Sequence, residues 1–223
     1  MSDSSQTDLA AWSIQSDPIH DSQKMFRMML RALSEPGILR EFDLPEMPSS
    51  TIDAALWNAL LTLCDLDTPV WIAPELDSTS FRAALGFYTG APVTDEMEKA
   101  AFAVLSVETF APPYSSADAD FSSSFPFNKG SDIYPDRSTT LLVQVPRLEN
   151  SAGWQLRGPG IASMRELDIG DHAGCIALMN LLSKNRDTFP CGLDVMLTSG
   201  NRLTAIPRST MVIASDKEVL PCM

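Results

Sequence analysis

Residues 141–145 read LLVQV, a run of leucine and valine broken by one glutamine, and they form the clearest predicted β-strand of this 223-residue chain. Short apolar runs of this kind are typical of strands that lie inside a sheet. Two similar segments precede it, at residues 70–72 (VWI) and 101–105. Residues 154–157 follow it and are expected to continue the same sheet. The four segments therefore predict one central sheet.

A hairpin is expected to close this sheet near the C-terminus. Residues 194–198 and 202–206 flank Ser199-Gly200-Asn201. A Gly-Asn pair at the centre of so short a connection favours a tight turn between antiparallel strands.

The first predicted helix carries Phe26, Met29, Leu30 and Leu33 at i, i+3, i+4 and i+7, which places them on one face. The helix is expected to end within Ser34-Glu35-Pro36-Gly37. Proline disfavours the helical conformation of the residue before it, and glycine readily adopts a positive φ.

Three more helices are expected between the strands. One begins near Ser50, with Asp53 three residues later as a weak capping box, and a second begins at Ser78 or Ser80. The last covers residues 172–184. Helices that alternate with strands predict an α/β fold with a mixed sheet, parallel where helices cross over and antiparallel near the end.

The domain organisation is expected to be simple. Residues 21–214 are assigned to one α/β domain, with a long Ser-, Asp- and Pro-rich loop over about 109–136. Residues 1–20 and 215–223 are assigned to tails, the first of them flexible. The start lacks the basic and apolar regions of a signal peptide, and no run reaches the roughly 18 apolar residues that span a bilayer. A cytoplasmic location is therefore expected.

Composition argues against several classes of function. The formal net charge of −13 disfavours generic binding to nucleic acid or to an anionic membrane. The four cysteines form no C-x-x-C pair and the only histidines are His20 and His172, so neither a zinc site nor a histidine triad is expected. His172 lies near the N-terminus of a predicted helix and is interpreted as structural or solvated. The glycine patterns that bind phosphate or dinucleotides and the G-x-S-x-G elbow are absent from the sequence.

Two kinds of polar residue are candidates for a site. Asp65 and Asp67 follow a helix, and two nearby carboxylates can divide acid and base roles or bind a cation. Aspartates at such a place also bond local amides and end helices, an alternative that we leave open. Arg137, Arg157 and Arg208 each follow or precede Pro or Gly, where a forked guanidinium could hold an anion or simply pair with an acidic side chain.

Seven segments, in order from about residue 21 to 212, resemble the phosphonate-metabolism protein PhnH family, the H subunit of carbon–phosphorus lyase. The first resembles the pattern F-R-x-L-L-x-A-(M/L)-S-E-P-G. The seven segments are Phe26 to Gly37, Leu60 to Trp71, Thr89-Gly90-Ala91-Pro92, Pro135-Asp136-Arg137, Leu156-Arg157-Gly158-Pro159-Gly160-Ile161, Phe189 to Asp194, and Ala205 to Thr210.

The resemblance implies a three-layer α/β/α fold similar to that of pyridoxal-phosphate-dependent transferases, without that cofactor. It implies a homodimer in isolation and, in the cell, a complex with the G, I and J subunits. That complex replaces the adenine of ATP with an alkylphosphonate at ribose C1, and the H subunit has no reaction of its own. No cofactor and no metal are expected, and none of the five lysines lies in a context that indicates a Schiff base.

Two further hypotheses stay open. In one, the chain is a ligand-binding subunit or an enzyme with a pocket for a ribosyl, phosphate or phosphonate group. Its candidate residues are Ser34, Glu35, Asp65, Asp67, Arg137, Arg157 and Arg208. In the other, weaker hypothesis the chain is a pyridoxal-phosphate enzyme, which a visible spectrum after addition of the cofactor would test.

Overall fold

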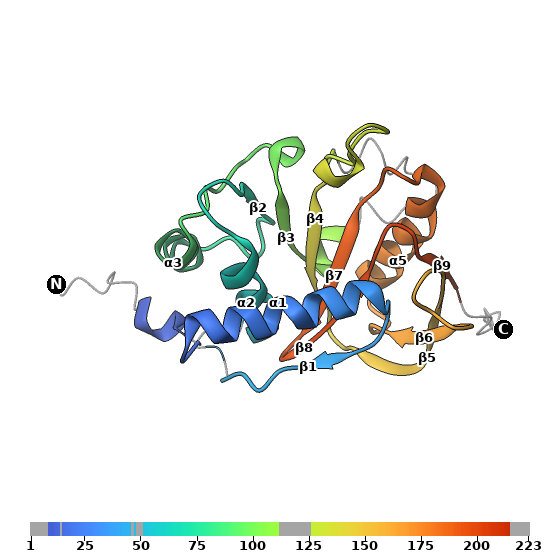
Figure 1. Ribbon diagram of the computed structural model, residues 1–223, viewed down its shortest axis with the longest axis horizontal. Helices are drawn as coiled ribbons and strands as arrows, with labels where there is room; N and C mark the ends of the chain where they lie inside the picture. Colours follow the sequence, from blue (N-terminus) through green and yellow to red (C-terminus); the bar gives the residue numbers. More distant parts are fainter. Residues whose placement is uncertain (1–8, 14, 46, 48–50, 112–125, 215–223) are drawn as a thin grey trace.

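The computed structural model describes residues 9–13, 15–45, 47, 51–111 and 126–214. Its strands form two sheets, a six-stranded sheet in the order β1-β8-β7-β4-β3-β2 and a three-stranded sheet in the order β6-β5-β9 (Figure 1). The strands are β1 Arg40–Glu41, β2 Val70–Ile72, β3 Phe102–Ser106, β4 Thr140–Gln144, β5 Glu149–Arg157, β6 Arg165–Asp168, β7 Asp194–Ser199, β8 Arg202–Ile206 and β9 Met211–Ile213.

The described residues also form four α-helices and five short 3-10 helices. The α-helices are α1 Pro18–Ser34, α2 Ala54–Leu63, α3 Thr79–Thr89 and α5 Ala173–Asn185. The 3-10 helices are η1 Leu9–Trp12, η2 Met97–Lys99, η3 Val107–Phe110, η4 Pro135–Arg137 and η5 Arg186–Thr188. No helix in the described part of the chain is long and apolar enough to cross a membrane.

The six-stranded sheet is mixed, as the sequence predicts. Strands β2, β3, β4 and β7 run parallel, whereas β8 pairs antiparallel with β7 and with β1. The predicted hairpin is confirmed, because Ser199 pairs with Arg202 across Gly200, whose φ is 61°. The α/β class and the mixed sheet are therefore correct.

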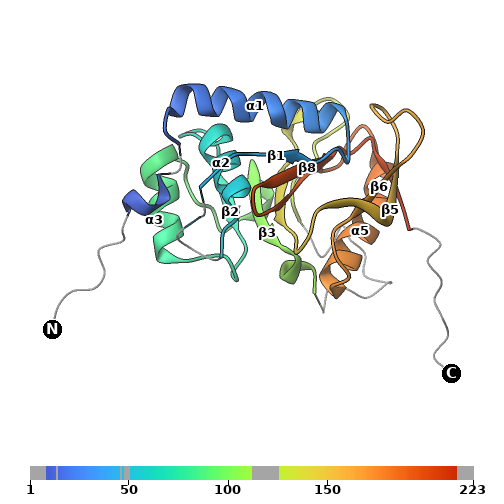
Figure 2. The ribbon, with the colours of Figure 1, turned by 90° about the horizontal axis from the view of Figure 1, so that it is seen from below.

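The central strands are buried on both faces, and their side chains alternate between two apolar cores. Val104, Leu142 and Met196 lie in the core under α1, α2 and α3, while Leu105 and Leu141 lie in the core on the other side. Figure 2 shows α1 and α5 on opposite sides of the strands. Burial on both faces explains why these strands are continuous apolar runs without polar alternation.

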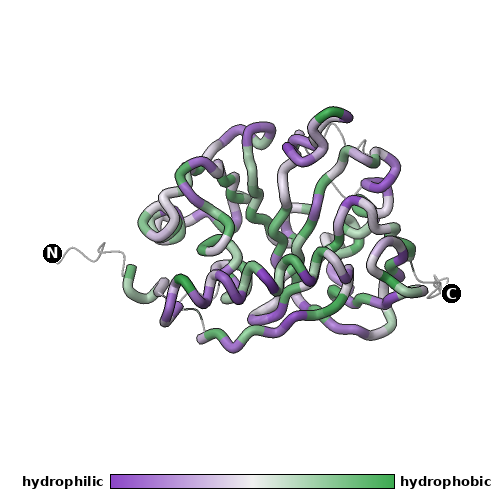
Figure 3. Tube along the Cα trace, viewed as in Figure 1, coloured by the Kyte–Doolittle hydropathy of each residue, from purple (hydrophilic) through white to green (hydrophobic). Residues whose placement is uncertain are grey.

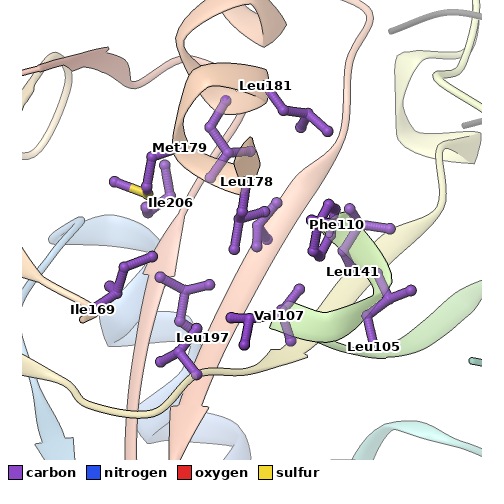
Figure 4. Packing of buried hydrophobic residues seen from close by; sticks show 14 of the residues in the cluster. Leu105, Val107, Phe110, Leu141, Ile169, Leu178, Met179, Leu181, Leu197 and Ile206 are labelled. Atoms are coloured by element: carbon purple, nitrogen blue, oxygen red, sulfur yellow. The ribbon is translucent and has the colours of Figure 1, made fainter. Parts of the chain in front are cut away.

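The second core is made by α5 and the three-stranded sheet. Leu178 and Met179 of α5 pack among residues of the large sheet such as Leu197 and Ile206 (Figure 4). From the small sheet, Leu156, Leu167 and Val212 are buried in the same core. This face of the large sheet is thus covered by one helix and a second sheet.

The ends of the predicted helices agree with their capping chemistry. The amide of Phe81 donates to the Ser78 hydroxyl at 3.2 Å, and Gly90 ends α3 with a φ of 73°. Asp53 is the N-cap of α2, but its side chain makes no capping hydrogen bond. Ser50, where that helix was expected to begin, lies outside the described residues.

The structure corrects the prediction that residues 154–157 continue the central sheet. Strand β5 pairs with β6 and β9 and belongs to the small sheet. It begins at Glu149, five residues earlier than expected, and only Leu156 of its residues is fully buried. A half-exposed strand of this kind cannot occupy the centre of a sheet that helices cover on both faces.

Part of the segment that was assigned to the N-terminal tail packs against the domain. Trp12 is only 4% exposed and stacks on Phe81, with ring centroids 5.7 Å apart, and the indole of Trp57 donates to the Trp12 carbonyl at 2.7 Å. Helix α1 then begins at Pro18, with Asp17 as its N-cap. Residues 1–8 and the C-terminal tail over 215–223 lie outside the described residues.

The loop expected over residues 109–136 is described only in part, because residues 112–125 lie outside the described residues. It starts within η3, and among its described residues from 126 to 136 only Phe127 is buried. Phe127 is buried and contacts Trp71, with ring centroids 5.5 Å apart.

The buried face of α1 agrees only in part with the predicted one, since Met29 is buried and Leu33 packs against the core, as expected. Met25, Met29 and Ala32 are buried, whereas Phe26 and Leu30 are exposed. Both sets have helical spacing, so the sequence periodicity could not decide which of them faces the sheet.

Candidate functional site

Three motif segments that are distant in sequence meet at the C-terminal end of α1. They are Ser34 to Gly37, Leu156 to Gly160 and Ala205 to Thr210. The Gly37 amide donates to the Ala205 carbonyl at 3.1 Å. The Arg165 guanidinium donates to the carbonyl of Glu35 at 3.1 Å and also to that of Pro36. We refer to this region as the motif junction.

Two glycines allow these segments to approach each other. At Gly37, with a φ of 78°, a Cβ atom would lie 2.6 Å from Cδ1 of Leu156. At Gly160, with a φ of 79°, a Cβ atom would lie 2.0 Å from the Ser34 carbonyl oxygen. The glycines of the S-E-P-G and G-P-G strings thus have a packing reason as well as a conformational one.

Arg208 is held by partners from two distant parts of the chain. Its Nη2 donates to Oδ2 of Asp194 at 2.6 Å, its Nε donates to Oδ1 at 3.2 Å, and its amide donates to Oδ1 at 2.9 Å. The guanidinium also donates to the carbonyl of Pro135 and to the hydroxyl of Ser138. Its side chain is 12% exposed. We call this group the Arg208 clamp.

Asn185 supports the same region, although nothing in the sequence marks it as special. Its side-chain amide donates to the Leu193 carbonyl at 2.7 Å, and its Oδ1 accepts from the Leu193 amide at 2.9 Å. This buried pair fixes the segment that leads into Asp194 at the start of β7. The clamp therefore rests on a satisfied polar network.

Asp65 and Asp67 form a turn between α2 and β2. Oδ1 of Asp65 accepts from the Asp67 amide at 3.0 Å, and the Asp65 amide donates to the Thr68 hydroxyl at 2.6 Å. Both aspartates are exposed. Strands β3 and β4 separate this turn from the clamp at the start of β7. This geometry matches the alternative of local turn chemistry.

The other candidate residues lie at the surface. Ser34 donates to the Arg31 carbonyl at 3.0 Å, and Glu35 pairs with Arg40. Arg137 lies over the Tyr134 ring, 4.0 Å from its centroid. Arg157 is exposed at the end of β5.

The seven candidates thus divide into three neighbourhoods. Ser34, Glu35 and Arg157 belong to the motif junction. Arg137 and Arg208 lie around η4, and the two aspartates lie apart from both. A single pocket built from all seven has no support in this arrangement.

Sequence reasoning missed a polar group at the carboxyl ends of the parallel strands, the edge where open α/β sheets commonly bind ligands. Gln144 ends β4, and its side-chain carbonyl accepts from the Asp53 amide at 2.6 Å. The Thr198 hydroxyl donates to Oδ2 of Asp53 at 3.2 Å. Burial raises the pKa of the Asp53 carboxyl, and hydrogen bonds from Gly200 and Thr198 offset part of that rise.

A second polar group follows β2 and β3 at the same edge. The hydroxyls of Ser106 and Thr109 both donate to Oε1 of Glu75, the first at 2.8 Å. Ser106 also caps η3, because its hydroxyl accepts from the Glu108 amide at 3.2 Å. For this second group the sequence did offer a signal, because Ser106 directly follows the predicted strand at residues 101–105.

The expected position of His172 near a helix N-terminus is confirmed. It is the N-cap of α5, where its Nδ1 accepts from the Gly174 amide at 3.2 Å. Its Nε2 lies 3.4 Å from Oε1 of Glu108. Within residues 9–13, 15–45, 47, 51–111 and 126–214, no three His, Cys, Asp or Glu side chains are placed to hold a metal ion.

A hollow of about 280 Å³ lies between the N-terminal half of α1 and the segment after β1. Its polar walls include Asp21, Lys24, Asp43 and Asn58. The volume is slightly below the roughly 300 Å³ at which small-molecule sites begin. None of the seven candidate residues lines it.

Comparison with known proteins gives two findings. The model of the family "Bacterial phosphonate metabolism protein (PhnH)" matches residues 14–213. The alpha-D-ribose 1-methylphosphonate 5-triphosphate synthase subunit PhnH of Rhizobium meliloti (strain 1021) is 34% identical over 194 residues. That alignment covers 87% of this chain and 91% of the relative.

Proposed function

This chain belongs to the PhnH family of bacterial phosphonate metabolism proteins, and we propose that it acts as a non-catalytic, accessory subunit of the carbon–phosphorus lyase core complex. In this role it supports the ATP-dependent formation of ribose 1-alkylphosphonate 5-triphosphate during organic phosphonate catabolism. The name of the Rhizobium relative, a subunit of a synthase for the methyl form of that product, supports the proposal.

The observation that carries the non-catalytic role is the use of the motif residues within the fold. Arg208, the most buried candidate, already binds Asp194, Pro135 and Ser138. The Asp65–Asp67 pair is an exposed turn. Side chains whose hydrogen-bonding groups are already used within the protein hold its segments together. They leave few donors or acceptors that could bind a substrate.

The finer parts of the proposal concern partners and cofactor. We propose that the chain is a homodimer in isolation, joins the G, I and J subunits in the cytoplasm, and uses no cofactor. We also propose that its layered fold resembles that of pyridoxal-phosphate-dependent transferases. The exposed apolar side chains on α1 support a role in assembly, because contiguous apolar surface often marks an interface.

A ligand-binding role is the second candidate, and the motif junction favours it over other places. Ser34, Glu35 and Arg157 share that region, and the last of them is exposed. Calorimetry with ATP, ribose phosphates and alkylphosphonates tests it. Heat of binding at millimolar ligand that Arg157→Ala removes would establish a site there.

Reconstitution tests the main proposal. The purified chain is assayed alone, the G, I and J subunits are assayed without it, and all are assayed together, with ATP and methylphosphonate. We expect adenine release only when the other subunits are present, and a higher rate or yield of complex when this chain is added. Turnover by the chain alone would contradict the accessory role.

A further inference from the structure

Helix α1 leaves one stripe of large apolar side chains in solvent. Ile19 is 81% exposed, Phe26 is 46% exposed and Leu30 is 49% exposed. Spacings of seven and four residues place them within about 40° of one another around the helix. Single exposed apolar residues are ordinary, but Phe26 and Leu30 lie one turn apart on the same side of the helix, and Ile19 lies on that side two turns earlier.

A stripe of basic side chains runs beside the apolar one. Lys24, Arg27 and Arg31 are exposed and follow each other at spacings of three and four residues. Among the described residues, no carboxylate lies within ion-pair distance of these three side chains. Figure 3 shows hydrophobic and hydrophilic residues succeeding one another along this helix, which crosses the front of the molecule.

The basic stripe is unusual for this chain. The protein carries 16 Lys and Arg against 29 Asp and Glu, for a net charge of −13. Within Pro18–Ser34, however, Lys24, Arg27 and Arg31 stand against Asp21 alone. Asp21 lies at the N-terminal end, where its carboxylate accepts from the Asp17 amide at 3.0 Å. The outer face of α1 is therefore a local positive region on an acidic protein.

We propose that the outer face of α1, made of Ile19, Phe26 and Leu30 beside Lys24, Arg27 and Arg31, docks another subunit of the complex. The partner surface is an apolar groove bordered by Asp and Glu side chains. Apolar anchors supply affinity in such contacts, and complementary charges supply orientation and fast association. This inference rests on the proposed function, because it identifies the surface through which that function is carried out.

A second copy of this chain is a poor occupant of the same surface. A symmetric contact brings the same patch of both copies together. In an antiparallel pair of α1 helices it would place the two basic stripes side by side, and like charges across an interface oppose association. The free charge on the stripe therefore points to an acidic partner of different sequence.

The test uses the full chain with an affinity tag, co-expressed with the G, I and J subunits. Two variants alter the surface, the double variant Phe26→Ala/Leu30→Ala and the charge reversal Arg27→Glu. Two matched controls lie on α5, across the sheet, Ile176→Ala at a side chain that is 47% exposed and Lys184→Glu at an exposed lysine. Circular dichroism and thermal unfolding establish that each variant is folded.

We expect the wild-type chain and both controls to bind the other subunits equally. The Phe26→Ala/Leu30→Ala variant should bind about tenfold or more weakly, as expected for loss of apolar anchors. Arg27→Glu should weaken binding most at low salt, because ions screen charge pairs. If the surface variants bind the other subunits as tightly as the wild-type chain does, α1 is not the docking surface, although the proposed function still stands. Absence of wild-type binding would instead overturn the proposed function.

A photo-crosslinking residue in place of Phe26 identifies the occupant. We expect a covalent product with one of the other subunits, at a peptide that contains apolar residues and Asp or Glu. A product formed only between two copies of this chain would overturn the assignment of the partner.

Discussion

The Arg208 clamp and the outer face of α1 both contain residues of family-like motifs, yet their surroundings are opposite. In the clamp, one guanidinium binds a carboxylate, a hydroxyl and a carbonyl from segments far apart in the chain. On α1, Phe26 and Leu30 project into solvent beside basic side chains without ion-pair partners among the described residues. The contrast indicates that motif residues here serve two purposes, internal assembly and external contact.

The two regions should also contribute to different free energies, the clamp to that of folding and the outer face of α1 to that of binding a partner. Removing one partner of a paired, poorly solvated charge strands the other partner, so it destabilises the fold. Removing an exposed apolar side chain changes stability little, although it can remove most of the affinity for a partner. Variants in the two regions should therefore divide cleanly between loss of folding and loss of binding.

The largest effect is expected from Arg208→Ala. It removes the guanidinium from the Asp194 carboxylate and the Pro135 carbonyl, leaving only the backbone amide of residue 208 to donate to Asp194. It should lower the free energy of unfolding by about 3–5 kcal/mol. Urea denaturation measures the change. The control is Arg137→Ala, in which an exposed guanidinium loses only its contact with Tyr134, at a cost of about 1 kcal/mol or less. Equal losses in both variants would refute a special role for the clamp.

A matched pair on α1 sharpens the comparison. Met29→Ala removes a buried side chain and should destabilise the protein by about 2–5 kcal/mol, while Leu30→Ala, one residue away, should cost less than about 1 kcal/mol. Thermal or urea unfolding of the two variants measures the difference. A larger loss for Leu30→Ala would mean that the helix presents its other face to the sheet.

The smallest effect concerns Asp53, whose carboxyl has hydroxyl and amide partners but lies in no ion pair recorded for the described residues. Burial raises its pKa in the folded protein above the ordinary 3.8. As the pH rises through 3.8, the unfolded chain loses this proton first, so the folded state holds more protons and its stability falls. The fall ends once the pH exceeds the raised pKa.

The variant Asp53→Asn removes this titration. We expect the wild-type protein to lose stability relative to the variant as the pH rises above 3.8, and the difference to become constant at higher pH. Unfolding free energies measured at intervals from pH 3.5 to about 8 give the curve, a range that brackets the titration of a raised carboxyl pKa. A difference that is flat over the whole range would contradict the burial of a charged carboxyl at this place.

Much of the fold could be predicted from local patterns. The apolar runs at residues 70–72 and 141–145, the Gly200 hairpin and the Ser78 and Gly90 helix ends all agree with the structure. These features depend on neighbouring residues, through turn geometry, capping and burial on both faces. Strand β5 and the short strands β6 and β9 could not be assigned to a separate sheet, because that depends on pairing between distant segments.

The candidate site could be predicted only as a set of residue types. Arginines beside Pro or Gly were identified, but whether each meets an anion or an internal carboxylate depends on what the folded chain places opposite it. For Arg208 that group is Asp194, 14 residues earlier. The polar group of Asp53, Gln144 and Thr198 contains residues as many as 145 positions apart, so no local sequence pattern could reveal it.

The sequence by itself determined the α/β class, the family and the acidic character of this protein, because periodicity, ordered motifs and composition are properties of the linear chain. Tertiary structure alone decided which face of α1 is buried, which sheet β5 joins and where each arginine finds its partner. Two sets of apolar residues on α1 have helical spacing, so the sequence alone cannot tell which of them will pack against the sheet. Pairing over long separations likewise exists only after the chain has folded.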